Sequence, residues 1–344
     1  MINMSQSWRT LWIAAAVAVS TVSVVSAVGL MWKKKKRSFV RVGTVSKLYF
    51  FPVKGLKGIE VNTGKCTELG FEVNGLLDRS FMLIDNEGVL MSQKKGPTLA
   101  LLDVQIDGKT LTITTPSGEK LNVEIKDSPG ANDKIVPCRI VHDITKAVDC
   151  GNEAASFFQS YLNTPGVRLV RYFPKLIKRE YKPKGTGKPF ELELRKDNPH
   201  LSFQNYTAFH LVSKPSVEDL NSKLQNKTVS EQNFRPNILV DDCKPYAEDS
   251  WNYIKFSSGS IICNLTLFKR CLITTNDPNT GVLHVKEPLA TLKKYRIPSE
   301  PEVLRKTGGN PCLGIGCGVY KIGDITVGDD VFADVGPQPK MTGK

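Results

Sequence analysis

The residues best suited to chemistry lie around one cysteine. Cys271 directly follows Lys269 and Arg270, and it opens the apolar, β-branched run CLITT, which ends in the turn sequence NDPNTG. An adjacent cation favours the thiolate over the thiol, and the thiolate is the form that attacks electrophiles or binds a soft metal. A free cysteine is also a common small buried hydrophobe. The local sequence therefore leaves two interpretations open, a reactive thiolate and an inert buried thiol.

Three further basic residues stand at the ends of apolar runs. Lys54 in FFPVKGLKG follows a predicted strand and precedes a glycine, Arg79 in NGLLDRSFMLI precedes a strand, and Arg235 in NFRPNILV does the same. Arginine offers a bidentate fork and lysine a point charge, so the three could converge on a phosphate. Taken singly, each is more typical of a surface charge or an ion pair.

Other motifs give weaker signals. GTGKPF lacks the spacing of a P-loop, and no crossover helix follows GGNPCLGIGCG, so neither predicts a nucleotide site. The eight cysteines include no Cys-x-x-Cys pair and the four histidines are isolated, which argues against structural zinc and against a disulfide framework. The acidic pairs Asp241-Asp242 and Glu248-Asp249 are expected to be loop or cap charges.

The elements that would position these residues are mostly strands. From Gly43 onward, apolar runs alternate with turn signals, including Asp107-Gly108 and Pro116-Ser117-Gly118, which predict closely spaced hairpins. Such spacing is typical of a small antiparallel barrel or sandwich. The first helix is predicted over residues 151–163, where apolar residues recur at helical spacing.

The second half mixes strands and short helices. Residues 175–200 are rich in charge, glycine and proline, and predict a long loop at the domain boundary. PSVEDLNSKLQ predicts a helix begun by Ser216, with Asp219 three positions on. Strands are expected at NILVDD, WNYIKF, SIICNLTLF, CLITT and VYKI, and a short helix at EPLATLKKYR. The fold class is therefore mainly β (α+β), with a few helices.

The net charge of +13 is concentrated at the N-terminus. Residues 1–59 hold ten basic and no acidic side chains, so the rest carries 37 basic (47 minus 10) and 34 acidic ones, which removes the main support for a nucleic-acid function. Residues 11–32 carry no charge and, as a helix, would span about 33 Å, enough to cross a bilayer. Because Lys33 to Arg37 follow this stretch, an uncleaved anchor with the remaining chain in the cytosol is favoured over a removed signal peptide.

Several of these strings together resemble one family. The chain is similar to the MOSC proteins, and within them to the mitochondrial amidoxime-reducing components, over roughly residues 40–335. The resemblance implies an anchor with its basic flank at 1–40, a MOSC N-terminal β-barrel-like domain at 41–175, the MOSC β-barrel domain at 176–336 and a tail at 337–344. The strings that carry it are FFPVKGLKG, LLDR, DCGNEAA, NFRPNI, YAEDSW, RCLITTNDPNTG and KEPLATLKKYR.

The resemblance also implies a molybdenum cofactor, a pyranopterin dithiolene with a terminal phosphate. Cys271 matches the family's molybdenum ligand, and Lys54, Arg79 and Arg235 match its cofactor-binding cations. Close vertebrate members have serine at Gly55 and at Ala208, a threonine-alanine-arginine stretch at 92–94, and an aromatic residue near Gly318. Further cofactor-lining positions fall on or beside Gly55, Thr207, Ala208, Asn237, Lys269 and Arg270.

The implied activity is reduction of N-hydroxylated compounds, such as amidoximes and hydroxylamines, with electrons from NADH through cytochrome b5 reductase and cytochrome b5. Asp277 is a candidate for positioning substrate or a proton, with a turn-forming role as the alternative. The implied location is the outer mitochondrial membrane, facing the cytosol, with the endoplasmic reticulum and peroxisomes as alternatives. A non-catalytic carrier of the cofactor or of sulfur, and a membrane-tethered scaffold without cofactor, are the competing functions.

Overall fold

The computed structural model describes residues 37–141, 143–176, 179–180, 200–225 and 227–343. The chain divides into a short unit, Met1–Ser38, and a second unit, Phe39–Lys344, which holds every element below. The predicted anchor at 1–40 thus falls almost wholly outside the described residues. Within the described ranges, none of the helices combines the length and hydropathy that spanning a bilayer requires.

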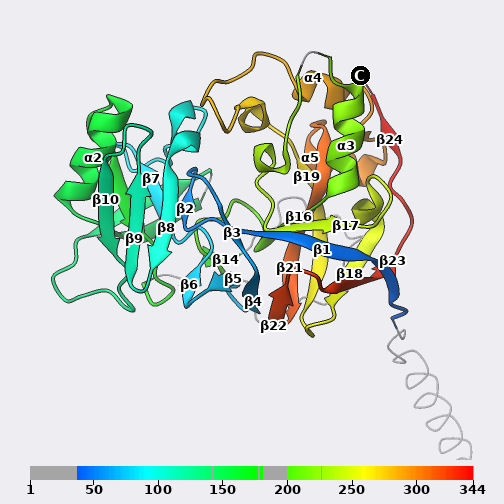
Figure 1. Ribbon diagram of the computed structural model, residues 1–344, viewed down its shortest axis with the longest axis horizontal. Coiled ribbons are helices and arrows are strands. Elements are labelled where there is room, and N and C mark those ends of the chain that lie inside the picture. The colour runs from blue at the N-terminus through cyan, green and yellow to red at the C-terminus, as the bar shows by residue number, and fades with distance from the viewer. Residues whose placement is uncertain (1–36, 142, 177–178, 181–199, 226, 344) are drawn as a thin grey trace, which may run out of the picture. The chain divides into compact units, whose positions relative to one another are not determined.

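A closed barrel forms the larger half of the second unit. Its sheet has the order β17-β16-β21-β19-β18-β23-β1-β3, and an additional pairing of β17 with β1 closes seven of the strands into a ring (Figure 1). The predicted mainly β fold with a β-barrel is confirmed. The strands are β1 (Val40–Phe50), β3 (Ile59–Val61), β16 (Phe209–Ser213), β17 (Ile238–Asp241), β18 (Trp251–Phe256), β19 (Ile261–Lys269), β21 (Cys312–Lys321) and β23 (Asp330–Val335).

Strand β1 ties the barrel together because it pairs with β23 through its first half and with β3 through its last residues, while β17 runs along its other edge. Gly43 lies where this crossing is tightest. A Cβ atom there would stand 2.4 Å from the carbonyl oxygen of Asp241, so only glycine lets the two strands approach. Leu48 and Phe50 are fully buried and extend the barrel core toward the smaller half of the unit.

The smaller half holds two further sheets and one covering helix. The order of the first is β11-β12-β13-β7-β2, and that of the second is β10-β9-β8. Helix α2 (Asn152–Leu162) confirms the predicted helix, and the hairpins at Asp107-Gly108 and Pro116-Gly118 are present. The strands are β2 (Val53–Lys54), β7 (Phe81–Ile84), β8 (Asp103–Asp107), β9 (Thr110–Thr114), β10 (Lys120–Glu124), β11 (Ile135–Ile140), β12 (Asp143–Asp149) and β13 (Arg168–Arg171).

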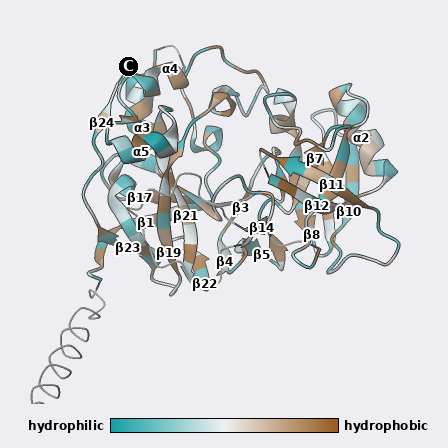
Figure 2. Cartoon of the chain, turned by 180° about the vertical axis from the view of Figure 1, so that it is seen from behind, coloured by the Kyte–Doolittle hydropathy of each residue, from teal (hydrophilic) through white to brown (hydrophobic). Residues whose placement is uncertain are grey.

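Short elements complete the unit. Four strands form the sheet β22-β4-β5-β6, and α4 confirms the predicted short helix after Glu287. Figure 2 shows hydrophobic residues along the buried strand β7 and hydrophilic ones on the exposed helix α5. The remaining elements are β4 (Thr63–Thr67), β5 (Gly70–Val73), β6 (Leu76–Leu77), β14 (Arg179–Glu180), β15 (His200–Leu201), β20 (Ile297–Pro298), β22 (Gly323–Thr326), β24 (Met341–Thr342), α3 (Lys214–Lys223), α4 (Leu289–Lys293), α5 (Pro301–Thr307), and the 3₁₀ turns η1 (Pro97–Leu101), η2 (Glu231–Asn233), η3 (Ala247–Ser250) and η4 (Leu272–Thr275).

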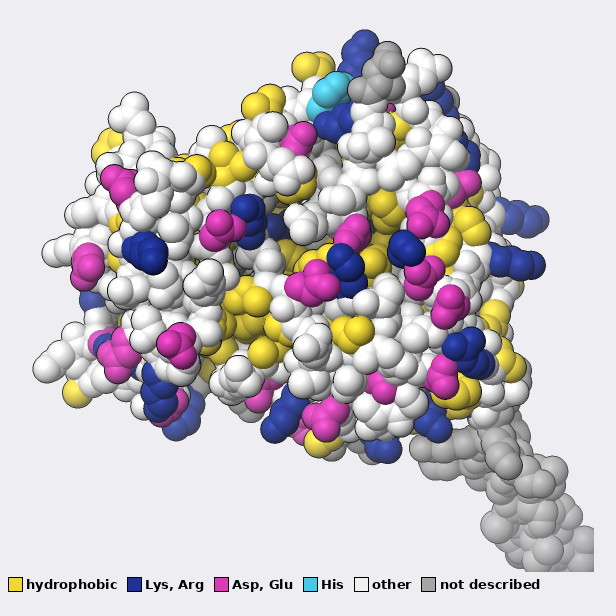
Figure 3. All heavy atoms as spheres, viewed as in Figure 1, with side chains coloured by type: hydrophobic (Ala, Val, Ile, Leu, Met, Phe, Trp, Pro, Cys, Tyr) yellow, Lys and Arg dark blue, Asp and Glu magenta, His cyan; other side chains and the backbone are white. Residues whose placement is uncertain are grey.

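Charges of both signs are mixed over the face seen in Figure 3, without a patch of one sign. This agrees with the near balance of 37 basic (47 minus 10) and 34 acidic residues after residue 59. A nucleic-acid interface needs a basic stripe or patch, and this face offers none.

The predicted start of one helix was wrong, and two acidic side chains of the turn η3 are more buried than loop charges usually are. Helix α3 begins at Lys214 with Ser213 before it, so Ser216 lies inside the helix, where its Oγ donates a hydrogen bond to Glu248 (3.1 Å). Glu248 and Asp249 are buried rather than exposed loop charges, because Glu248 also accepts from the Ser213 amide (3.1 Å) and Asp249 pairs with Arg296 (2.6 Å).

Candidate functional site

Nine of the eleven predicted site residues line one cavity of about 150 Å³ between the two halves. They come from β2, from the turn before β7, from the segments before β16 and β17, and from the end of β19. These nine are Lys54, Gly55, Arg79, Thr207, Arg235, Asn237, Lys269, Arg270 and Cys271. The lining also includes Leu90, Ser92, Gln93, Gln204, Asn205, Tyr206, His210, Asn233, Phe234, Phe268, Ile273 and Thr274.

Cys271 stands at the start of a turn rather than in a strand. The predicted strand CLITT is wrong, because β19 ends at Lys269 and residues 272–275 form the 3₁₀ turn η4 with Cys271 as its N-cap. The Cys271 carbonyl accepts hydrogen bonds from the Thr274 amide (3.0 Å) and hydroxyl (2.8 Å). This turn fixes the backbone of Cys271 and leaves its side chain exposed at the cavity.

Exposure separates Cys271 from the chain's seven other cysteines. All seven are buried or half-buried, and burial raises the pKa of the Cys150, Cys243 and Cys312 thiols to about 12. A thiol with such a pKa is a poor nucleophile and a poor metal ligand at neutral pH. Of the two interpretations left open by the sequence, the geometry favours the functional thiolate for Cys271.

Two arginines share one aromatic ring beside the cavity. The guanidinium carbons of Arg79 and Arg235 lie 4.5 Å and 4.3 Å from the centroid of the Phe51 ring. Arg79 also forms an ion pair with the buried Asp78 and donates to the Asn237 side chain (3.3 Å). Both arginines have positive φ angles, 54° and 55°, a conformation that costs non-glycine residues energy and clusters at functional sites.

Among the described residues, Asp78 is the carboxylate that pairs with Arg79 and acts on Arg235. Nη2 of Arg235 is buried without a hydrogen-bond partner among the described residues. Burial, and then the charge of Arg79, lower the pKa of Arg235 to about 9. An unpartnered guanidinium beside a second one is a binding site for an anion, because a bound anion would satisfy the open donor and offset the repulsion.

The other predicted contacts form the walls of the cavity. Lys54 Nζ donates to the Phe203 carbonyl and to Asn205 Oδ1, both at 2.7 Å. Asn237 donates through Nδ2 to the Tyr49 carbonyl (3.2 Å), which joins its segment to β1. Thr207 Oγ1 donates to the Phe209 carbonyl (3.0 Å). Hydrogen bonds to backbone carbonyls thus hold the side chains of Lys54 and Asn237 at the cavity wall.

Arg270 has a structural role next to Cys271. It is 3 % exposed, and its guanidinium donates to the carbonyls of Leu313 (2.9 Å from Nε) and Phe234 (3.3 Å). Its Nη2 also lies 2.5 Å from Nε2 of His210, whose Nδ1 is 3.3 Å from the Arg235 carbonyl. Since arginine only donates, Nε2 accepts and Nδ1 carries the proton. The His210 ring thus connects Arg270 to the backbone of Arg235.

His210 escaped the sequence analysis because its partner Arg270 is 60 positions away. Burial and the charge of Arg270 lower its pKa well below 6.5, so the ring stays neutral. Within FHLVS it has the appearance of an ordinary buried strand residue, and only the folded chain shows its role. Tyr206, at the exposed side of the cavity, carried no sequence signal either.

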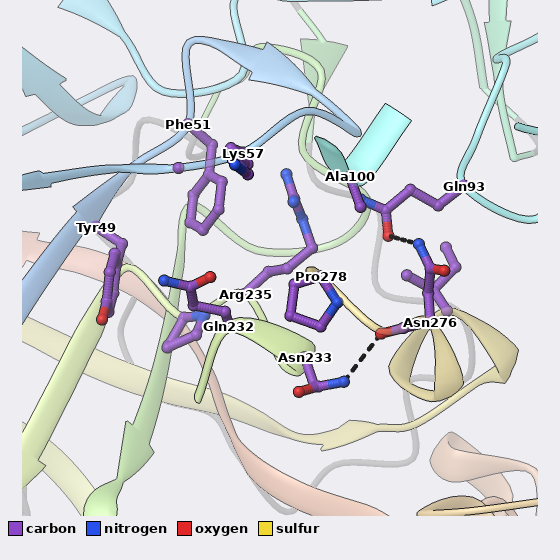
Figure 4. A pocket seen from close by; sticks show the side chains of 13 residues that line it. Tyr49, Phe51, Lys57, Gln93, Ala100, Gln232, Asn233, Arg235, Asn276 and Pro278 are labelled. Atoms are coloured by element: carbon purple, nitrogen blue, oxygen red, sulfur yellow. Dashed lines mark hydrogen bonds between the residues drawn. The ribbon is translucent and has the colours of Figure 1, made fainter. Parts of the chain in front are cut away.

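A small pocket of about 20 Å³ adjoins the cavity and shares Gln93, Asn233, Arg235 and Ile273 with it (Figure 4). Asn233 Nδ2 donates to the Asn276 carbonyl (2.9 Å), and Asn276 Nδ2 donates to Gln93 Oε1 (3.3 Å). Gln93 in turn donates to the Gly55 carbonyl (2.6 Å). This chain of carboxamides connects the turn after Cys271 with the Lys54-Gly55 segment of the smaller half.

Two predicted site residues do not line the cavity. The Asp277 carboxylate accepts a hydrogen bond from the Asn279 amide (2.8 Å), which is the turn-forming alternative. Ala208 is buried, and its methyl group faces Gly70, where a Cβ atom would lie 3.4 Å away.

The lining has a distinctive chemistry. It contains five cationic side chains and one exposed thiol, and no aspartate or glutamate. Among the described residues, no three His, Cys, Asp or Glu side chains gather into a metal site. The cavity therefore suits an anionic group, and its one exposed thiol is of a kind that can bind a soft metal.

Comparison with known proteins assigns this chain to a family. Residues 42–165 match the MOSC N-terminal beta barrel domain, and residues 198–332 match the MOSC domain. The human and rat proteins named mitochondrial amidoxime reducing component 2 are 35% and 34% identical, each over 92% of this chain and 90% of its own length. Human mitochondrial amidoxime-reducing component 1 is 32% identical over 93% of both chains. The chain therefore belongs to the MOSC domain family, with the mitochondrial amidoxime reducing components as its relatives.

Proposed function

We propose that this protein is a membrane-anchored molybdenum enzyme that reduces N-hydroxylated compounds. The observation that carries the proposal is the exposed Cys271 thiol in a cavity lined by five cations and no carboxylate. The names of the relatives, amidoxime reducing components, give the substrate class. Reduction of an amidoxime consumes two electrons and two protons, breaks the N–O bond, and releases an amidine and water.

The residues present fit a pyranopterin cofactor. When bound, the cofactor would supply a molybdenum centre that accepts electrons singly and delivers them as a pair. Cys271 would donate its thiolate to the metal, since molybdenum beside dithiolene sulfur is a soft centre. The unpartnered Nη2 of Arg235, with Arg79 and Lys54, would hold the phosphate.

The chain's own residues keep this site rigid. Phe51 holds both arginine planes, and Asn237 receives a hydrogen bond from Arg79 (3.3 Å). Arg270 and His210 support the backbone on either side of the cavity through buried hydrogen bonds. Such preorganisation limits the reorganisation needed when a highly charged group binds.

The electron donors and the location extend the proposal. Cytochrome b5 and its NADH-dependent reductase are the proposed partners, and they would deliver electrons one at a time. The uncharged stretch 11–32 followed by Lys33 to Arg37 supports an anchor that leaves the catalytic unit in the cytosol. The names of the relatives support a mitochondrial location, within which the outer membrane is the proposed site.

The test combines metal analysis with a cysteine substitution. Purified protein should contain molybdenum and pterin in stoichiometric amounts and reduce benzamidoxime when NADH, cytochrome b5 reductase and cytochrome b5 are supplied. Cys271→Ser should abolish this turnover, whereas Cys150→Ser, which changes a half-buried thiol outside the cavity, should not. Full turnover by the Cys271 variant would refute the assignment.

The same cavity would also serve a non-catalytic carrier of the cofactor, because a basic site binds the group whether or not it turns over. The two functions differ in one result. A carrier would hold molybdenum and pterin yet reduce no N-hydroxylated compound under the complete electron-transfer mixture, while the proposed enzyme would do both.

A further inference from the structure

One cation of the cavity differs from the other four in its surroundings. Lys54 and Arg270 donate to backbone carbonyls, Arg79 pairs with Asp78, and Arg235 stacks on Phe51. Lys269 is exposed, and within the described ranges no hydrogen bond or ion pair is found for its side-chain ammonium group. Its charge is therefore available to a molecule entering the cavity.

Lys269 lies beside the ring of Tyr206, which is also exposed to solvent. Its Nζ stands 5.3 Å from the centroid of Tyr206, a cation–π contact, and Tyr206 is 37% exposed. Both residues line the cavity together with Cys271, and Lys269 precedes Cys271 by two positions.

Tyr206 and Cys271 line the same cavity. A flat aromatic ring thus lines the cavity at which the Cys271 side chain is exposed. Planar π systems such as the C=N–OH group of an arylamidoxime stack on such faces.

We propose that Tyr206 and Lys269 form a substrate-selecting rim, in which Tyr206 stacks on planar N-hydroxylated compounds and Lys269 favours negatively charged over positively charged ones. This inference rests on the proposed reductase function and adds its substrate preference. Because the product amidine is cationic at neutral pH whereas the amidoxime is neutral, the same lysine would also favour product release.

The expected preference follows from Coulomb's law. At a separation of about 8 Å and an effective dielectric constant of about 40, one charge pair changes affinity by roughly fivefold. An anionic substrate should thus exceed a neutral one by about fivefold in kcat/KM, and the neutral one should exceed a cationic one by about the same factor. Added salt should reduce both differences in kcat/KM, because ions in solution screen the charge of an exposed lysine.

The experiment uses three benzamidoximes of similar size, bearing a para carboxylate, carboxamide or trimethylammonium group. In cofactor-loaded protein, kcat/KM should fall from the carboxylate to the carboxamide to the trimethylammonium compound. Lys269→Gln should reduce the differences between the three values, and Lys269→Glu should reverse their order. Lys146→Gln, which removes an exposed lysine of β12 and changes the net charge equally, should leave the order intact. Tyr206→Leu should raise KM for all three by about fivefold, whereas Tyr206→Phe should not.

Two further readouts separate the possible failures. If Lys269→Gln lowers the molybdenum content, Lys269 holds the cofactor rather than the substrate, and the rim is refuted. Calorimetric binding of the three corresponding benzamides tests the rim without turnover. Absence of turnover with every substrate would refute the reductase function alone, while unchanged charge order in the Lys269 variants, in kcat/KM or in Kd, would refute the rim alone.

Discussion

Arg79 donates a hydrogen bond through Nη2 to the backbone carbonyl of Arg235 (3.2 Å), so two guanidinium groups are held on one aromatic ring. Without a bound anion this arrangement is unfavourable, because burial and the charge of Arg79 both oppose the charge on Arg235. It becomes favourable once an anion lies against the pair. The two arginines are therefore arranged for binding rather than for stability.

Replacing Arg235 by methionine should separate these two effects. The variant loses one cation–π contact and an unsatisfied buried donor, so the free energy of unfolding of the cofactor-free protein should stay within about 1 kcal/mol of wild type or rise. Molybdenum content should fall at least tenfold. Urea unfolding and metal analysis measure the two quantities.

Arg139→Met supplies the matched control, because Arg139 lies exposed on β11, outside the cavity lining. It should change neither quantity. A large loss of stability in the Arg235 variant would show that the guanidinium supports the fold and would contradict the binding role.

Alkylation of the native, cofactor-free protein should single out Cys271. It is exposed, whereas the other seven thiols are buried or half-buried, and three of these have pKa values of about 12. A short exposure to iodoacetamide at pH 7.5 should give one adduct, located at Cys271 by peptide mass spectrometry. Loaded protein should resist the reagent. Equal labelling of Cys150 or Cys243 would contradict the exposure difference.

The sequence predicted the barrel, the hairpins and nine cavity residues, because strand alternation and turn residues act locally and the family strings mark the site. It failed where distant partners decide the outcome. CLITT has strand-forming residues, yet the Cys271 carbonyl is satisfied by Thr274 in a turn. Glu248 resembled a loop charge because its partners, Ser213 and Ser216, lie more than thirty positions earlier.

His210 predicts a pH dependence of stability. Its folded pKa lies well below 6.5, so the unfolded chain takes up a proton that the folded chain does not as the pH falls below about 6.5. The His210 contribution is complete above that pH and is lost as the pH falls toward the folded pKa. The loss should approach about 1.4 kcal/mol per pH unit.

Unfolding in urea at pH 7.5 and pH 5 checks this linkage. His210→Gln should lower stability at pH 7.5 and show a shallower decline toward pH 5. His284→Gln, at an exposed histidine, should retain the wild-type decline. If the His210 variant declines as steeply as wild type, another group carries the pH dependence.

Asn233 should control how firmly the Cys271 turn is held. Its Nδ2 donates to the carbonyls of Thr274 (3.3 Å) and Asn276 (2.9 Å), so Asn233→Ala leaves two buried acceptors short of a donor and should cost about 1–3 kcal/mol. Because the turn carries the proposed metal ligand, molybdenum should also leave the variant faster during dialysis against a chelator. Gln232→Ala, at the exposed neighbour in the same 3₁₀ turn, controls for the local backbone and should change neither value by much. A destabilised Asn233 variant that keeps its molybdenum as long as wild type would show that the turn supports the fold without contributing to metal retention.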